Sequence, residues 1–374
     1  MTQETFLPGE YILDELKERG WSQTDLSDIL GYSPTVISEI ISGKRTISIK
    51  FAQALAEAFG TSAQLWLNLQ NAYDLTLVSS SKDIISRRAK LYAKAPIREM
   101  IRRRWIEKIN NIEILEKQVY KFLEIDNIDD EVKFAYEARK SDDYNTKPNP
   151  IQTAWLMRAK MLAPSAPIKG KYSDNNFEYI MAELIPLRLE PEAIRQIPGI
   201  FSKYGIRLVV IEYLPQAKID GACFWLDSQS PVIALSMRFD RIDYFWFTLV
   251  HDLFHIKNRQ DKKSPLMETL VIGEDAQPFD EKPQEEKRAD KFAAEILVNQ
   301  KELHNFMLRH QRLYSEKSII AFARMNRVHP GIVVGQLHYR RAFHWKYFRS
   351  MLTKVREYIT DTALTDGWGK IIIK

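Results

Sequence analysis

Apolar positions and glycine breaks divide the first 78 residues into four or five short amphipathic segments. In the first segment, Ile12, Leu13 and Leu16 fall on one face of a helix that is predicted to start at Pro8 and to stop at Gly20. Serines suited to helix N-caps open the next segments, which cover residues 22–30, 33–42, 48–59 and 62–75. The pattern predicts an all-α N-terminal domain.

The pattern changes in the last part of the chain, where β-rich runs precede a longer helical segment. Residues 206–214, 221–227 and 231–237 are rich in β-branched and aromatic side chains, which predicts three strands. A small sheet that leads directly into a helix gives residues 151–374 an expected α+β fold.

The helix that follows the predicted sheet covers residues 241–260. Its apolar residues, among them Phe245 and Leu249, recur at mostly helical intervals. Asp240 or Asp243 is available to cap its start.

Residues 79–150 predict a helical connector. Two helices break at Pro96, further helical segments run to about Arg139, and the polar stretch 141–150 ends with prolines and predicts a linker. We therefore expect a multidomain chain with an all-α domain at 1–78, a connector at 79–150 and an α+β domain at 151–374.

Two further segments of the C-terminal domain are distinctive in composition. Residues 259–284 are polar and contain three prolines, which predicts an exposed insertion. Residues 338–349 are basic and aromatic and predict a tail helix with an exposed basic face; stacking on nucleic acid is the alternative.

The charges are distributed unevenly. The chain carries a net charge of +5, but residues 1–75 hold 5 Lys/Arg against 10 Asp/Glu, whereas residues 82–104 hold 9 against 2. The basic run Arg102–Arg104 beside Trp105 could bind DNA phosphates, or it could be a solvated face of a helix that packs through its apolar side.

Composition limits the class of protein. A single cysteine, Cys223, excludes an internal disulfide framework and favours a reducing compartment; it lies in an apolar strand and is expected in the core. No apolar run approaches the roughly 20 residues of a membrane helix, and no signal pattern opens the chain. We expect a soluble cytoplasmic protein.

The second and third predicted helices are joined by a tight glycine turn, and the third is rich in small polar residues. This arrangement is typical of a helix-turn-helix DNA-binding unit. The stretch also resembles the antitoxin HigA branch of the Cro-repressor-like (XRE) family. The matching residues are Pro8-Gly9-Glu10, Ser22-Gln23-Thr24-Asp25-Leu26, Ser38-Glu39-Ile40-Ile41-Ser42-Gly43-Lys44-Arg45, Trp66-Leu67-Asn68-Leu69-Gln70 and Tyr73-Asp74-Leu75.

This resemblance implies a set of contacts with operator DNA, made by a homodimer on a palindromic site. The residues that it places at base edges in the major groove are Ser33, Thr35, Val36 and Ser38. Those that it places on the DNA backbone are Gln23, Lys44 and Arg45.

The alternative for this domain is a helical bundle used for dimerisation or partner docking. The acidic total of residues 1–75 supports that alternative, because non-specific DNA affinity comes mainly from Lys and Arg. The predicted recognition helix is also poor in Arg and contains Glu39.

A pair of histidines in the 241–260 helix carries the strongest chemical signal. His251 and His255 are four residues apart, so on a helix both imidazoles lie on one face and can meet at one point. This is the arrangement of the helical H-E-x-x-H zinc motif, except that position 252 is Asp.

A third zinc ligand is expected on a following helix. Glu286 stands 31 residues after His255, and Glu286 and Asp290 lie four apart on one helical face. Glu286 would complete the metal site, and Asp290 would orient His251 by accepting its other N–H.

At this point the chain resembles the ImmA/IrrE family of zinc metallopeptidase-like domains, over roughly residues 190–340. The matching stretches are Phe245 to His251, Glu286 to Glu295, and Pro330 to Gly335. The resemblance implies Zn²⁺ held by His251, His255 and Glu286, a zincin-like fold, cleavage of a repressor or other protein partner, and a general base at position 252.

Asp252 departs from that pattern. It has the chemistry of a general base but a side chain shorter than Glu by one C–C bond, about 1.5 Å, and ångström-scale misplacement can cost on the order of 10²-fold in rate. Phe254 replaces the usual small residue before the second histidine. A bound metal with weak or no catalysis, a competent peptidase, and a metal-free domain used for sensing or docking all remain open.

Three functional hypotheses follow. The first is a DNA-binding regulator or antitoxin whose C-terminal domain senses or processes a signal. The second is an active zinc endopeptidase that cuts a repressor or toxin partner. The third is a metal-free antitoxin that neutralises a toxin by binding it.

Overall fold

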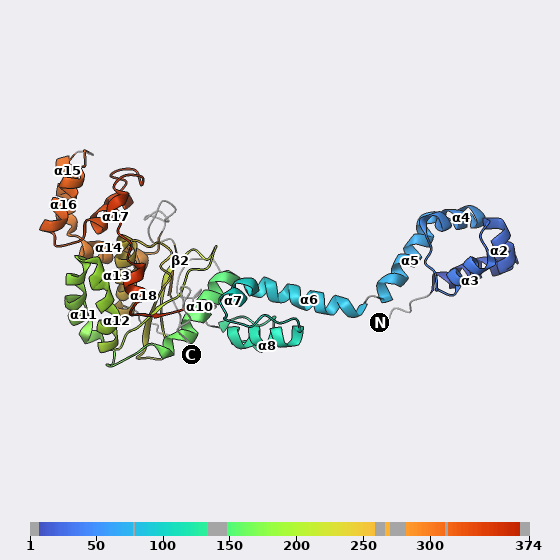
Figure 1. The fold of residues 1–374 in the computed structure, drawn as a ribbon, viewed down its shortest axis with the longest axis horizontal. Coiled ribbons are helices and arrows are strands. Elements are labelled where there is room, and N and C mark those ends of the chain that lie inside the picture. Colours follow the sequence, from blue (N-terminus) through green and yellow to red (C-terminus); the bar gives the residue numbers. More distant parts are fainter. Residues whose placement is uncertain are drawn as a thin grey trace. The chain divides into compact units, whose positions relative to one another are not determined.

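The computed structural model describes residues 7–77, 79–133, 148–258, 266–269, 282–310 and 313–366. The chain folds into two compact units, Met1–Lys90 and Leu91–Lys374 (Figure 1). Among the described residues, no helix combines the length and the apolar character needed to cross a lipid bilayer.

The described part of the first unit is helical, as the sequence predicted. Ser22, Ser33 and Ser48 cap three of its helices, each through a side-chain oxygen that accepts a backbone N–H three residues on. The helices are α1 (Pro8–Arg19), α2 (Gln23–Leu30), α3 (Pro34–Ile41), α4 (Ile49–Phe59), α5 (Ala63–Leu77) and α6 (Ser79–Lys94), the last of which continues into the second unit.

The start of α1 packs closely against the end of α3. A Cβ atom on Gly9 would lie 2.0 Å from the carbonyl oxygen of Ile41, so only glycine allows this approach. The helices enclose one hydrophobic core, whose members include Ile12, Leu26, Ile37, Phe51, Leu55 and Trp66.

The second unit is built on a mixed five-stranded sheet with the order β4-β2-β3-β1-β5. β1 pairs in parallel with β3 and β5, and β2 is antiparallel to β3 and β4. The three predicted strands are confirmed. The strands are β1 (Arg207–Val210), β2 (Ile219–Trp225), β3 (Pro231–Leu235), β4 (Leu266–Thr269) and β5 (Leu364–Thr365).

Helices cover both faces of this sheet, because alternate residues of each strand enter two different cores. Val210 and Cys223 point into a core shared with α13, while Val209 and Ala222 point into a core shared with α8 and α10. Figure 1 shows α11 to α14 on one side of the sheet and α7, α8 and α10 on the other. The helices are α7 (Ile97–Arg102), α8 (Ile112–Leu123), α10 (Pro150–Leu162), α11 (Phe177–Leu184), α12 (Ile197–Lys203), α13 (Ile242–Asn258), α14 (Gln284–Leu297), α15 (Gln300–His310), α16 (Glu316–Met325), α17 (Pro330–Tyr339) and α18 (Arg356–Thr360).

Residues 91–133, expected as part of a connector, pack against the sheet within the second unit. Nη1 of Arg103 lies 3.0 Å from Oε2 of Glu212, and Nε1 of Trp105 donates to Oδ2 of Asp366 over 2.7 Å. The Arg103 side chain is buried in this contact. Arg103 is thus engaged with Glu212 and with the carbonyl oxygen of Tyr213 inside the second unit.

Some predicted segments lie outside the described residues. They are the helical stretch from 134 to Arg139, residues 141–147 of the linker, and residues 259–265 and 270–281 of the insertion. Of that insertion, the structure describes β4 and the three residues 282–284.

The prediction of a tail helix over 338–349 was wrong. α17 ends at Tyr339, and Arg341 and Phe348 adopt left-handed φ angles of 53° and 58° that stop a helix. The chain turns back here, so that the Trp345 ring stacks on His338 with centroids 4.7 Å apart. The aromatic residues cover the end of α17 and do not form a helix face.

Asp240 has a different role from the predicted cap of the histidine helix. Its Oδ1 accepts the backbone N–H groups of Val355 and Arg356 at 2.8 and 2.7 Å, at the start of α18. Asp243, the other candidate, forms an ion pair with Arg241 in the first turn of α13.

Candidate metal centre and recognition helix

Helix α13 is buried on nearly all sides, and this determines where its polar residues can point. Leu249, Val250 and Leu253 fill the core around it, and α13 contacts β2, β3, α14 and α17. A helix enclosed in this way must satisfy any polar side chain through protein partners. The Nε2 atoms of His251 and His255 both face Glu286 on α14.

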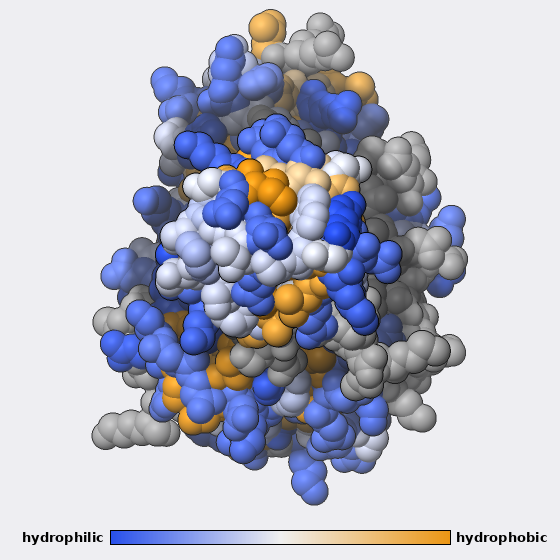
Figure 2. Space-filling model, turned by 90° about the vertical axis from the view of Figure 1, so that its right-hand side faces the viewer, coloured by the Kyte–Doolittle hydropathy of each residue, from blue (hydrophilic) through white to orange (hydrophobic). Residues whose placement is uncertain are grey.

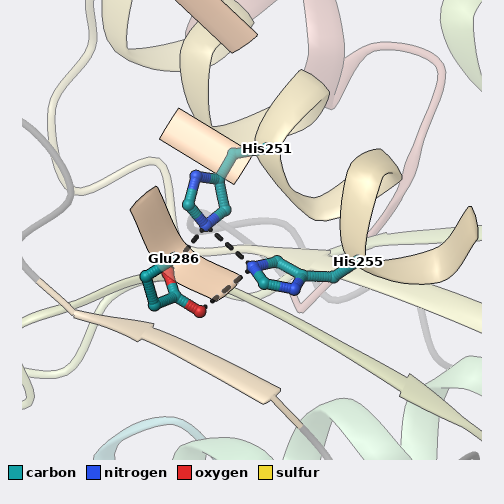
Figure 3. A group of neighbouring side chains, drawn as sticks. All are labelled: His251, His255 and Glu286. Atoms are coloured by element: carbon teal, nitrogen blue, oxygen red, sulfur yellow. Dashed lines mark hydrogen bonds and ion pairs between the residues drawn. The ribbon is translucent and has the colours of Figure 1, made fainter. Parts of the chain in front are cut away.

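Three side chains from α13 and α14 converge on one point, as Figure 3 shows. Nε2 of His251 lies 3.0 Å from Oε2 of Glu286, and Nε2 of His255 lies 3.1 Å from Oε1. The two Nε2 atoms are themselves 3.0 Å apart. All three residues are buried.

This arrangement fits a metal ion better than a set of hydrogen bonds. Each imidazole Nε2 carries either one proton or one lone pair, yet Nε2 of His251 has two polar neighbours at 3.0 Å. Two nitrogens about 2.0–2.1 Å from one tetrahedral zinc ion would be about 3.3 Å apart. The ligand atoms of His251, His255 and Glu286 are the group of this kind found within the described residues.

The two imidazoles beside Glu286 favour the ionised form of its carboxylate. Burial alone would raise the pKa of Glu286, but hydrogen bonds from His251 and His255 outweigh it and hold that pKa well below its ordinary value. An ionised carboxylate with two imidazoles is a donor set that zinc prefers.

The second nitrogen of His251 lies beside Asp290, the residue expected to orient it. Nδ1 of His251 lies 3.1 Å from Oδ1 of Asp290. The other oxygen of Asp290 accepts a hydrogen bond of 2.6 Å from Nζ of Lys282, and both side chains are buried. The sequence does not single out Lys282, because this residue lies at the end of a polar stretch that predicts an exposed insertion.

Asp252 points to another side of α13. It is buried with Thr248 against β2: a Cβ atom on Gly221 would lie 2.8 Å from Oδ2 of Asp252 and 2.8 Å from Cγ2 of Thr248. The histidines face α14, so the helix separates its acidic residue from its imidazoles by about a quarter turn.

His251, His255 and Glu286, called the metal group below, would allow a bound zinc ion to act as a Lewis acid. When bound there, zinc would supply a Lewis acid that polarises a carbonyl or a water molecule. His251, His255 and Glu286 would hold it, and Asp290 would fix the tautomer and ring orientation of His251.

In the first unit, the residues predicted to contact DNA lie together around α3. All but one are exposed, and Val36 is half-buried against the core. The exposed members of the set are Gln23, Ser33, Thr35, Ser38, Lys44 and Arg45.

Arg45 also has a protein partner. Its Nε donates to Oε2 of Glu39 over 2.8 Å, between the last turn of α3 and the loop after it. Glu39 therefore restrains one of the two cations predicted to bind phosphate.

Two family models match the chain. The model described as helix-turn-helix matches residues 12–66, and the model described as IrrE N-terminal-like domain matches residues 202–331. Virulence-associated protein I of Dichelobacter nodosus is 41% identical over 80 residues, which are 21% of this chain and 74% of that protein. The chain belongs to the helix-turn-helix family.

Other similarities cover the same helix-turn-helix domain. The uncharacterised HTH-type transcriptional regulator YddM of Escherichia coli is 31% identical over 77 residues, 21% of this chain and 82% of that protein. The solved Pseudomonas aeruginosa antitoxin HigA, with the higBA promoter, is 34% identical and covers 21% of this chain and 88% of its own, with a TM-score of 0.21.

The IrrE N-terminal-like domain contains the metal group. Its matched range begins in α12 and ends in α17, so it includes β1 to β3, α13 and α14. His251, His255 and Glu286 all lie inside it.

Proposed function

We propose that this protein is a sequence-specific DNA-binding transcriptional regulator, acting as the antitoxin of a toxin–antitoxin type system, whose C-terminal domain binds zinc and senses or processes a signal. The exposed polar face of α3 on a helix-turn-helix core is the observation that carries the DNA-binding part.

Helix α3 has one face for the core and another for a partner. Ile37 and Ile40 are buried, whereas Thr35 and Ser38 are exposed on the opposite side. Their hydroxyl groups can both donate and accept hydrogen bonds, as base edges in the major groove require. Gln23, Lys44 and Arg45 flank this face and supply backbone contacts.

A homodimer would double these contacts on a palindromic operator. Exposed apolar side chains on α5, namely Leu65, Leu75 and Leu77, support a protein partner on this unit. Figure 2, seen from the side on which Figure 1 draws α2 to α4, shows hydrophobic patches on a mostly hydrophilic surface.

The regulator hypothesis also draws on the relatives. YddM is described as an HTH-type transcriptional regulator, and its similarity to this chain covers the domain that holds α3. A toxin partner would bind the same chain, and copurification with the product of a neighbouring gene would test it.

For the second domain, sensing is better supported than cutting. His251, His255 and Glu286 are enclosed by protein, with Glu286 the most exposed at 6%. Asp252, the candidate general base, is packed against Gly221. An enclosed metal whose candidate base packs against the neighbouring strand suits a structural or sensory role; an active endopeptidase is the alternative.

Selection of operator sequences from random duplex DNA tests the first part. We expect one palindromic sequence to be enriched. Thr35→Ala and Ser38→Ala should each cost about 1–3 kcal/mol on that sequence and relax specificity, whereas Lys44→Ala should weaken all sequences alike and reduce the salt slope by about 1. Lys17→Ala on α1 is the matched control. Enrichment of no sequence, or wild-type specificity in both α3 variants, would reject DNA recognition by α3.

Metal analysis of the purified protein tests the second part. We expect about one zinc per chain, lost in His251→Ala and in Glu286→Gln and retained in His304→Ala, which changes an exposed histidine. Wild-type protein that takes up no metal when zinc is supplied would make this domain a metal-free binding module.

A further inference from the structure

A cavity of about 310 Å³ lies between α13, α14 and α17. This volume falls at the lower end of the range for small-molecule pockets, about 300–1,000 Å³. Its walls are largely apolar and include Phe247, Ala294, Leu297 and Ile332. Such a wall favours the aliphatic or aromatic part of a ligand.

The acidic groups that border the cavity already have cationic partners. Asp243 accepts from Nη2 of Arg241 over 2.6 Å, and Asp290 accepts from Nζ of Lys282 over 2.6 Å. These carboxylates are therefore neutralised within the protein, and the cavity offers a cationic ligand little attraction.

The cationic residues Lys291, near the middle of α14, and Arg340, directly after α17, are exposed and border the cavity. Arg340 donates to the amide oxygen of Gln300, a neutral group. Gln300 in turn donates to Oε1 of Gln336 over 2.9 Å. This network holds a guanidinium beside the apolar walls, where it can bind a carboxylate.

We propose that this cavity binds a small organic acid, with its aliphatic or aromatic body between Phe247 and Ile332 and its carboxylate on Arg340. The ligand carries a single negative charge, because a second charge would lose its hydration against the apolar walls of the cavity.

The position of the cavity would couple the ligand to the metal centre, a step that rests on the proposed zinc site. Asp290 borders the cavity and also lies 3.1 Å from Nδ1 of His251. Phe247, one turn before His251, has its ring centroid 6.2 Å from that imidazole. The three metal ligands are not among the described residues that line the cavity. A bound ligand would thus contact Asp290 and Phe247, and these two residues would transmit its effect to the Nδ1 side of His251.

Titration calorimetry of the metal-free full chain tests the binding step, with octanoate as the acid and octan-1-ol as its uncharged match. We expect one octanoate per chain. Arg340→Gln should weaken octanoate about tenfold or more and leave octan-1-ol unchanged, while Arg309→Gln on α15 should change neither. Ala294→Phe should block both ligands by filling the cavity.

Failure of octanoate to bind, or equal affinity in Arg340→Gln and wild type, would overturn the proposal. The Arg340→Gln result does not depend on whether Ala294→Phe folds, because Arg340 is exposed.

A zinc competition titration with and without octanoate separates this inference from the proposed zinc site. We expect octanoate to change the zinc affinity about fivefold or more. Octanoate binding without zinc binding would reject the zinc site and leave the cavity assignment intact. Zinc binding that octanoate does not alter would reject the coupling through Asp290.

Discussion

The carboxylate of Asp252 and the backbone of Gly221 lie in contact between α13 and β2. A Cβ atom at position 221 would come within 2.8 Å of Oδ2 of Asp252. The absence of a side chain on the strand thus makes the room that the short acidic side chain occupies. The Asp-for-Glu difference in the H-x-x-x-H motif is matched to the packing of the strand beside it.

Asp252→Glu is therefore expected to destabilise the protein and not to restore a protease. The added methylene must enter the space between Thr248 and Gly221, and overpacking of this kind costs about 1–3 kcal/mol. Urea unfolding gives the change in the free energy of unfolding, and a quenched peptide library gives the proteolytic rate.

Gly221→Ala is the matched variant, because it crowds the same space from the strand and should cost a similar amount. A large gain in proteolysis by Asp252→Glu at wild-type stability would instead identify a peptidase that has lost its base, and would contradict the sensory hypothesis.

The clustering of His251, His255 and Glu286 could be predicted from sequence because it depends on two regular spacings. His251 and His255 are placed by the helical repeat, and Glu286 and Asp290 by the same repeat on a second helix. Lys282 could not be predicted, because its contact with Asp290 depends on how the chain enters α14. The place of Asp252 depends on Gly221, a tertiary contact that no local pattern encodes.

In the fold too, features set by local sequence could be predicted, whereas features set by tertiary contacts could not. Serine caps and glycine stops gave the helices of the first unit almost to the residue, since Ser22, Ser33 and Ser48 each accept the predicted backbone N–H. The tail helix failed, because the rings of residues 343–348 pack back on His338 and tertiary packing overrode a local pattern. β5 is two residues long and has too little sequence to signal a strand.

Lys282→Met should lower zinc affinity about 10–100-fold, the usual effect of losing a residue that supports a ligating histidine. Without the ammonium group, the buried Asp290 carboxylate loses its 2.6 Å partner and no longer fixes His251 in place. A zinc competition titration measures the change. Lys301→Met, on the exposed face of α15, should leave the affinity unchanged. Equal zinc affinities in the two variants would show that Asp290 holds His251 without help from Lys282.

Glu39→Gln should strengthen DNA binding. The change removes a carboxylate from the recognition helix and releases Arg45, whose ion pair with Glu39 is 2.8 Å long and largely exposed. Exposed pairs contribute about 0.2–1 kcal/mol, so the affinity should rise about 1.4-fold to fivefold. One added phosphate contact should steepen the salt slope by about 0.9. Fluorescence anisotropy over a salt series measures both quantities. Glu18→Gln on α1 has the same charge change and should have a smaller effect; an equal effect would mean that net charge alone, and not Arg45, is responsible.

His338 should make the second unit sensitive to acid. Burial lowers the pKa of His338 from 6.5 to about 4, although its Nε2 donates to the carbonyl of Tyr347 over 3.0 Å. Between these two pH values the unfolded chain binds a proton and the folded chain does not, so the free energy of unfolding falls as the pH falls from 6.5 to 4. Below pH 4 both states are protonated and this contribution no longer changes.

The expected loss from His338 is about 1–3 kcal/mol across that window. Urea unfolding at pH 7.5, 6, 5 and 4, followed by circular dichroism, measures it. His338→Gln should be less stable than wild type at pH 7.5, since it loses the stack with Trp345, but its stability should fall less steeply toward pH 4. His304→Gln changes an exposed histidine on α15 and should keep the wild-type slope. If His338→Gln kept the wild-type slope as well, the acid sensitivity would have to come from other groups, and the imidazole would act in packing alone.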